Sequence, residues 1–263
     1  MKAAAALAAP YLAWVAFILA FEVAGALGVP VPRGWAAPAY ALKSALCLAL
    51  LVALKPWREE GARGTEPARQ GGGIGAPGGR TLLWGISVGV AVFLLWVAPE
   101  SPWLFGHCRA LSLLYHRWFV TPLGAWPEYF DPEIFPALPA AASGLAFSPE
   151  EAGWPLAIAR LFGSAFVIAA AEEYFFRGFL YRWIRGRNWR TTPLSDFDAQ
   201  SFWIVVAVFA CEHDRWFMGA VAGIAYGLLA VKAGTLRPAI VAHVTTNLLL
   251  GLYVLCQGRF GFW

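Results

Sequence analysis

Residues 154–183 read WPLAIARLFGSAFVIAAAEEYFFRGFLYRW, an apolar stretch interrupted by Glu172-Glu173 and, four residues after Glu173, by Arg177. A membrane span needs about 20 mainly apolar residues, so this stretch predicts a transmembrane helix. An ionisable group at the bilayer centre costs about 2.5–3.5 kcal/mol on insertion scales. The cluster therefore indicates a functional site within a membrane, because a chain does not keep such costly groups without a use for them.

Two apolar segments further along the chain carry polar groups in the same way. One contains FACEH at residues 209–213, and the other contains HVTTN at residues 243–247. The depth of a residue in the membrane can be counted from the cytoplasmic end of its predicted helix, near Arg182, Gln200 or Arg237, at a rise of about 1.5 Å per residue. On this count Glu172, His213 and His243 lie about 15, 19 and 9 Å deep. The three helices thus place their polar groups at a similar depth, near mid-membrane.

The composition of the whole chain supports the membrane prediction. Of 263 residues, 59% are hydrophobic and 14% are charged, whereas an ordinary globular domain has about 25% charged residues. The 14 tryptophans suit a protein with two water–lipid interfaces. The net charge of +4 is modest and the arginines lie in short loops, which indicates orientation signals and no nucleic-acid partner. The four cysteines lack CxxC spacing, which argues against a disulfide framework.

The predicted fold is all-α: a polytopic membrane helical bundle of about seven transmembrane helices, or eight if residues 101–120 insert. The N-terminal part, residues 1–154, holds three spans, a Gly- and Arg-rich linker at 55–80 and a Pro-rich loop at 121–150. The second part, residues 155–263, is predicted to be the catalytic membrane domain. Gly219, Gly223 and Gly227 recur every four residues and predict a close helix-packing face. The predicted spans are 10–29, 38–54, 81–98, 154–183, 201–213, 216–233 and 238–256.

The basic residues predict the orientation of the chain. They gather in the 55–80 linker and in the loop after the fourth span, and Lys232 and Arg237 lie on the same side. By the positive-inside rule this side is cytoplasmic. We therefore expect the N-terminus in the cytoplasm and the Pro-rich loop on the outside.

Helical spacing predicts which polar side chains meet. Residues four apart share a face, so Glu173 can pair with Arg177 as a structural strut. Glu172 points about 100° away from Glu173 and is free to meet another helix. Phe209 shares a face with His213 in the same way. The predicted site consists of the four side chains Glu172, His213, His243 and Asn247.

Each group also has a plainer interpretation. Glu172 could belong to an Arg–Glu strut that holds helices together. His213 could be a histidine at a helix end that bonds a backbone carbonyl. His243 and Asn247 could make interhelical hydrogen bonds without taking part in chemistry.

The motifs EExxxR, FxxxH and HxxxN, in that order on successive membrane helices, resemble the CAAX prenyl protease and bacteriocin-processing family, abbreviated CPBP or ABI. The resemblance covers about residues 155–257. Glu212-His213, followed by Trp216 and by Gly219 to Tyr226, is similar to a bacterial subgroup associated with exosortase and PEP-CTERM protein sorting.

The resemblance implies an intramembrane endopeptidase of the bacterial inner membrane that cleaves a membrane-associated protein or peptide. It implies that Glu172 and His213 activate a water and that His243 and Asn247 stabilise the oxyanion. It also implies an exosortase-type sorting system as a partner. Glu173, Arg177, Phe209 and Glu212 are expected to support the site.

Several alternatives remain open at this point. A catalytically inactive family member could act in immunity or as a scaffold, and a proton-coupled transporter could use the same Glu and His groups. Glu172, His213 and His243 could also bind zinc and leave a position for water. Metal-free activation of water is favoured, because Asn247 suits an oxyanion donor better than a metal ligand.

Overall fold

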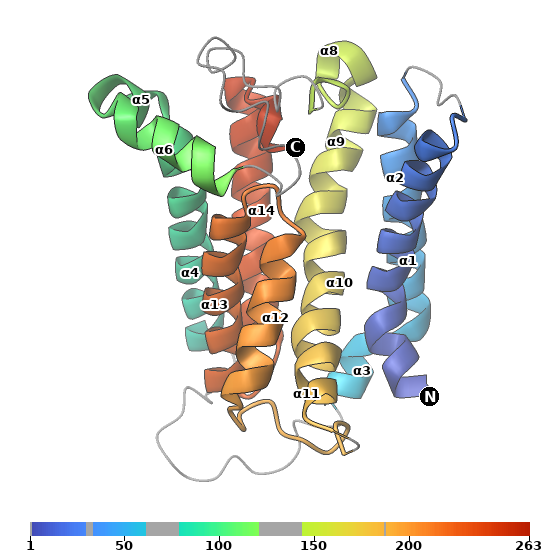
Figure 1. Ribbon diagram of the computed structural model, residues 1–263. Helices are drawn as coiled ribbons and strands as arrows, with labels where there is room; N and C mark the ends of the chain where they lie inside the picture. The colour runs from blue at the N-terminus through green and yellow to red at the C-terminus, as the bar shows by residue number, and fades with distance from the viewer. Residues whose placement is uncertain (1, 30–33, 62–78, 121–143, 187) are drawn as a thin grey trace.

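The computed structural model describes residues 2–29, 34–61, 79–120, 144–186 and 188–263. All regular secondary structure in these ranges is helical. The long helices run side by side as one bundle, with the N-terminus at its lower end and the C-terminus at its upper end in Figure 1.

Six helical stretches in the described residues are long and apolar enough to cross a membrane. A shorter apolar helix, α12 (Ala199–Cys211), lies beside them. Together they confirm the predicted polytopic bundle of about seven helices. The six stretches are α1 (Lys2–Ala26), α2 (Ala36–Leu54), α4 with the 3₁₀ turn that follows it (Gly79–Glu100), the continuous helix Trp154–Ile184, α13 (Trp216–Ala233) and α14 (Arg237–Gln257).

The segment 101–120 does not form an eighth span. It folds into α5 (Pro102–His107) and α6 (Arg109–Phe119), which are both too short to cross a bilayer. Figure 1 shows both helices at the upper end of the bundle, with α6 slanting across α4.

Some helix ends differ from the sequence prediction. The first helix begins at Lys2 and contains Pro10, because the alanine-rich residues before the proline are strong helix formers. The predicted linker begins with a short helix, α3 (Pro56–Gly61), and the predicted Pro-rich loop ends with another, α8 (Pro149–Ala152). Of these two predicted loops, residues 62–78 and 121–143 lie outside the described residues. The division of the chain at residue 154 stays a prediction.

The helix Trp154–Ile184 is not a regular α-helix along its whole length. It consists of α9 (Trp154–Phe162), a π-helical segment (Gly163–Ile168), α10 (Ala169–Glu173), a second π-helical segment (Tyr174–Leu180) and α11 (Tyr181–Ile184). π-Helical turns are rare and occur often at functional sites. Here they flank α10, the segment that ends with the two glutamates.

Small residues bring α4 and α13 close to their neighbours. A Cβ atom on Gly89 of α4 would lie 2.5 Å from the carbonyl oxygen of Ala242 on α14, so only glycine fits there. A Cβ on Gly227 of α13 would lie 2.8 Å from the ring of Phe202 on α12. The predicted packing face of α13 thus lies against α12, and the close approach of α4 supports the part of α14 that carries His243.

Candidate active site

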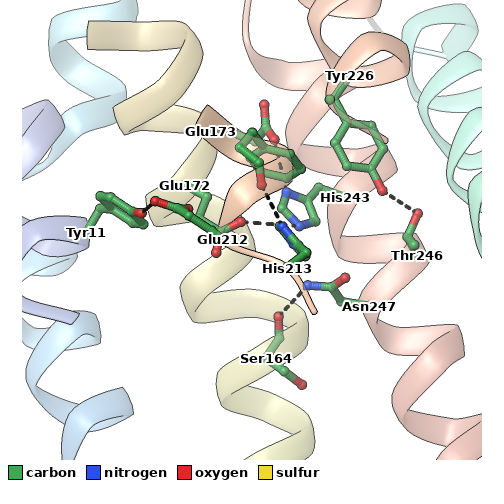
Figure 2. Close-up of polar contacts among 12 residues, drawn as sticks. Tyr11, Ser164, Glu172, Glu173, Glu212, His213, Tyr226, His243, Thr246 and Asn247 are labelled. Carbon is green, nitrogen blue, oxygen red and sulfur yellow. Dashed lines mark hydrogen bonds and ion pairs between the residues drawn. The ribbon is translucent and has the colours of Figure 1, made fainter. Parts of the chain in front are cut away.

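The candidate site is built from α10, the end of α12 and α14. Figure 2 shows Glu172, Glu173, His213, His243 and Asn247 gathered in one region of the bundle, with Tyr11 of α1 reaching in from the side. The three polar motifs of the sequence thus meet in space.

Glu173 and Arg177 form the predicted strut. Arg177 Nη1 donates to Glu173 Oε1 at 2.9 Å, and both side chains are almost completely buried. Arg177 Nη2 also donates to the carbonyl oxygen of Gly223 on α13 at 3.1 Å. The guanidinium lies over the ring of Phe209, with Cζ 4.5 Å from the ring centroid. Arg177 therefore ties α10 to α12 and α13.

Glu173 has a second contact that the sequence did not reveal. The same Oε1 atom lies 2.9 Å from Nδ1 of His243 on α14. A carboxylate paired with arginine has no proton to give, so Nδ1 of His243 carries the hydrogen of this bond. His243 can then donate from Nε2 only when both ring nitrogens are protonated. The strut therefore also orients an imidazole of the site.

Glu172 faces the other nitrogen of the same ring. Its Oε2 lies 3.6 Å from Nε2 of His243, and its side chain is 14% exposed. Oε2 is buried and has no hydrogen-bond partner among the described residues. Buried polar atoms are nearly always hydrogen-bonded, and the exceptions include groups with catalytic roles. Glu173 Oε2 is also buried without a partner among the described residues, so the two residues differ in the other oxygen of Glu173, Oε1, which has two donors.

His213 is the last residue of the predicted span 201–213 but lies two residues beyond α12, which ends at Cys211. Its Nδ1 is 2.7 Å from the carbonyl oxygen of Phe209, and its ring centroid is 4.7 Å from the Phe209 ring. A carbonyl oxygen can only accept, so Nδ1 carries the hydrogen and the neutral ring has its lone pair on Nε2. The plainer interpretation, a carbonyl-bonded histidine at a helix end, is therefore present, and it leaves a base at Nε2.

Asn247 and Tyr226 complete the surroundings of His243. Asn247 Nδ2 donates to the carbonyl oxygen of Ser164 at 2.9 Å, which uses one of its two amide hydrogens. The Tyr226 ring stacks on His243 with centroids 4.8 Å apart. The Tyr226 hydroxyl donates to Thr246 at 2.7 Å. These contacts hold one turn of α14 in a defined orientation and leave the second hydrogen of the Asn247 amide for another acceptor.

Residues 154–249 match a family model described as type II CAAX prenyl endopeptidase Rce1-like. We call this matched part the Rce1-like segment, because it is similar to that family. No curated protein and no solved structure matches the chain. The match confirms the predicted resemblance to the CAAX protease family and suggests a CAAX-type intramembrane protease.

The Rce1-like segment contains every residue of the predicted site, from Glu172 to Asn247. Two contacts reach the site from outside this segment. The Tyr11 hydroxyl of α1 donates to Glu212 Oε1, and the Trp96 ring of α4 lies 5.6 Å from the ring of His213. Tyr11 and Trp96 belong to no motif, so neither contact could be predicted from the sequence.

The zinc alternative involves Glu172, His213 and His243. No group of three or more His, Cys, Asp or Glu side chains in the described ranges is placed to hold a metal ion. Nδ1 of each imidazole in the Rce1-like segment already has an oxygen partner, Phe209 O for His213 and Glu173 for His243. A hydrogen bond at Nδ1 is also the usual outer contact of a histidine that binds metal through Nε2, so the alternative zinc site of Glu172, His213 and His243 stays a prediction.

Proposed function

We propose that this protein is an intramembrane endopeptidase that hydrolyses a peptide bond in a membrane-associated protein or peptide. The observation that carries the proposal is the difference between two neighbouring glutamates. Both glutamates have a buried Oε2 without a hydrogen-bond partner among the described residues. Glu173 Oε1 also accepts from Arg177 and His243, whereas Glu172 is not paired with Arg177 and its Oε2 lies 3.6 Å from His243 Nε2. A carboxylate with a free lone pair in an apolar site is suited to take a proton from water.

The proposed reaction uses the four predicted residues in two pairs. Glu172, together with Nε2 of His213, takes a proton from water while the water oxygen bonds to the carbonyl carbon of the substrate. The negative charge that develops on the carbonyl oxygen accepts hydrogen bonds from the second amide hydrogen of Asn247 and from Nε2–H of doubly protonated His243. When the C–N bond breaks, the proton passes to the departing amine.

The proposal includes the setting of the reaction. The distribution of Lys and Arg supports a cytoplasmic N-terminus, and the resemblance supports the bacterial inner membrane. An exosortase-type sorting system is the proposed cellular partner. Water activation is proposed to need no metal, since the residue pairs described above account for both the base and the oxyanion donors.

The test is a cleavage assay with purified protein in detergent. The probe is a quenched-fluorescence peptide that ends in a farnesylated CAAX sequence, and the same peptide without the farnesyl group is run beside it. Wild-type protein should cleave at least one of the two peptides. Glu172→Gln and His213→Ala should abolish cleavage while the protein still inserts and accumulates. The exposed Arg190→Met is the matched control and should cleave normally. Normal cleavage by well-folded Glu172→Gln would overturn the assignment.

A further inference from the structure

The turn between α12 and α13 carries His213 but has little regular structure of its own. It spans residues 212–215, after the last residue of α12 and before Trp216 of α13. The backbone amide of His213 donates a hydrogen bond to the carbonyl oxygen of Ala210. The turn is not part of a helix. A base that must be held within a fraction of an ångström therefore lies on the least regular element of the site.

The first residue of the turn is held by α1. Glu212 Oε1 accepts a hydrogen bond from the Tyr11 hydroxyl. Tyr11 is almost completely buried, and its ring stacks on Phe175 with centroids 4.4 Å apart. Packing therefore fixes the Tyr11 ring independently of its bond to Glu212, so the hydroxyl can serve as a rigid anchor for the turn (Figure 2).

The last residue of the turn is held from the end of α4. Both carboxylate oxygens of Glu100 contact the guanidinium of Arg215, from Nε to Oε1 and from Nη2 to Oε2, the second at 2.9 Å. The side chains are 6% and 7% exposed. Bidentate arginine–carboxylate pairs fix geometry as well as charge. Arg259 also donates to the backbone carbonyl of Glu100 at 2.6 Å, which anchors Glu100 to the C-terminal segment.

We propose that Tyr11 and Glu100 are positioning residues for His213, so that the N-terminal part of the chain completes the active site of the Rce1-like part. This inference rests on the proposed function, because it assigns the two contacts a role in the reaction. Neither residue lies in the segment that matches the family. Each holds one end of the turn, and the Trp96 ring packs against His213 between them.

The experiment needs a control that breaks a similar ion pair away from the turn. Glu60 of α3 and Arg182 of α11 provide it: Nη1 lies 3.1 Å from Oε2, and the side chains are 12% and 2% exposed. This pair also joins the N-terminal part to the Rce1-like part, but at the lower end of the bundle (Figure 1). Glu60→Gln should therefore cause a loss of stability similar to that of Glu100→Gln, but without moving His213.

The variants are compared by kcat and KM per folded molecule, with the peptide probes described above. Glu100→Gln should lower kcat by up to about 100-fold with little change in KM, since a misplacement of about 1 Å can cost that much. Tyr11→Phe removes one oxygen, keeps the ring stack and should lower kcat by about tenfold. Glu60→Gln should keep the wild-type kcat.

Hydrogen–deuterium exchange of backbone amides 209–216 is measured on the same samples and needs no substrate. Faster exchange in Glu100→Gln and Tyr11→Phe than in Glu60→Gln would support the proposal. A kcat for Glu100→Gln and Tyr11→Phe equal to that of Glu60→Gln would overturn it, provided that the wild type cleaves. If the wild type does not cleave, the proposed function fails. Equal hydrogen–deuterium exchange of amides 209–216 in all three variants would then also show that Tyr11 and Glu100 do not hold the turn in place.

Discussion

Replacing Arg177 by methionine should destabilise the protein strongly, although methionine keeps much of the side-chain volume. Arg177 is almost completely buried and supplies the charge that neutralises Glu173. Removing one partner of a buried ion pair costs about 3–5 kcal/mol, because the other charge stays buried and unpaired. The Gly223 carbonyl also loses its donor from Arg177, and Glu173 keeps only Nδ1 of His243.

This cost can be converted into a melting temperature. For a chain of 150–250 residues, about 1 kcal/mol shifts Tm by about 2–4 °C, so Arg177→Met should lower Tm by about 6–20 °C. Intrinsic tryptophan fluorescence in detergent, at one scan rate for all variants, would measure it. Arg190→Met, which removes an exposed arginine, should stay within about 2 °C of wild type.

A second substitution separates the loss of charge balance from the loss of packing. Glu173→Gln, added to Arg177→Met, removes the unpaired charge, and the amide oxygen can still accept from His243 Nδ1. The double variant should recover part of the lost Tm. An Arg177→Met protein that melts within about 2 °C of wild type, or a double variant no more stable than the single one, would refute the strut.

Three further predictions concern the site and its setting. Asn247→Ala should lower kcat by about 10²–10³-fold with little change in Tm, since one oxyanion donor is worth about that much; unchanged kcat would remove Asn247 from the oxyanion site. A topology reporter inserted within residues 60–75 should read as cytoplasmic and one within 125–145 as external, and the reverse pattern would invert the proposed orientation. Purified active protein should contain well under one zinc per chain and resist a chelator, whereas loss of activity on zinc removal and recovery on zinc addition would establish a metalloprotease.

The membrane bundle could be predicted because span length and hydropathy are local properties of the chain. The helix 216–233 was predicted with the bounds that the structure shows, and the others differ by a few residues except at the N-terminus. The Glu173–Arg177 pair could also be predicted, because side chains four residues apart on a helix lie next to each other whatever surrounds the helix.

The contacts between distant segments could not be predicted in this way. The Tyr11–Glu212 bond joins residues 201 positions apart, and no periodicity within either helix points to it. The Glu173–His243 contact depends on how α10 and α14 lie against each other. The π-helical segments on both sides of α10 are another such case, because a sequence pattern read with a period of 3.6 residues does not reveal them.

In the proposed mechanism, the two neighbouring glutamates give one helix both a rigid support and a reactive group. Glu173 is paired with Arg177 and also accepts a hydrogen bond from His243, so two contacts fix its orientation. Glu172, one residue earlier, points about 100° away from Glu173. It is not the carboxylate that pairs with Arg177, but it faces the same imidazole ring of His243. The ring of His243 is therefore held at Nδ1 by the carboxylate that pairs with Arg177, and its Nε2 faces the carboxylate of Glu172 at 3.6 Å. Arg177 pairs with the glutamate four residues before it, and exchanging the two roles would require the arginine to turn toward Glu172.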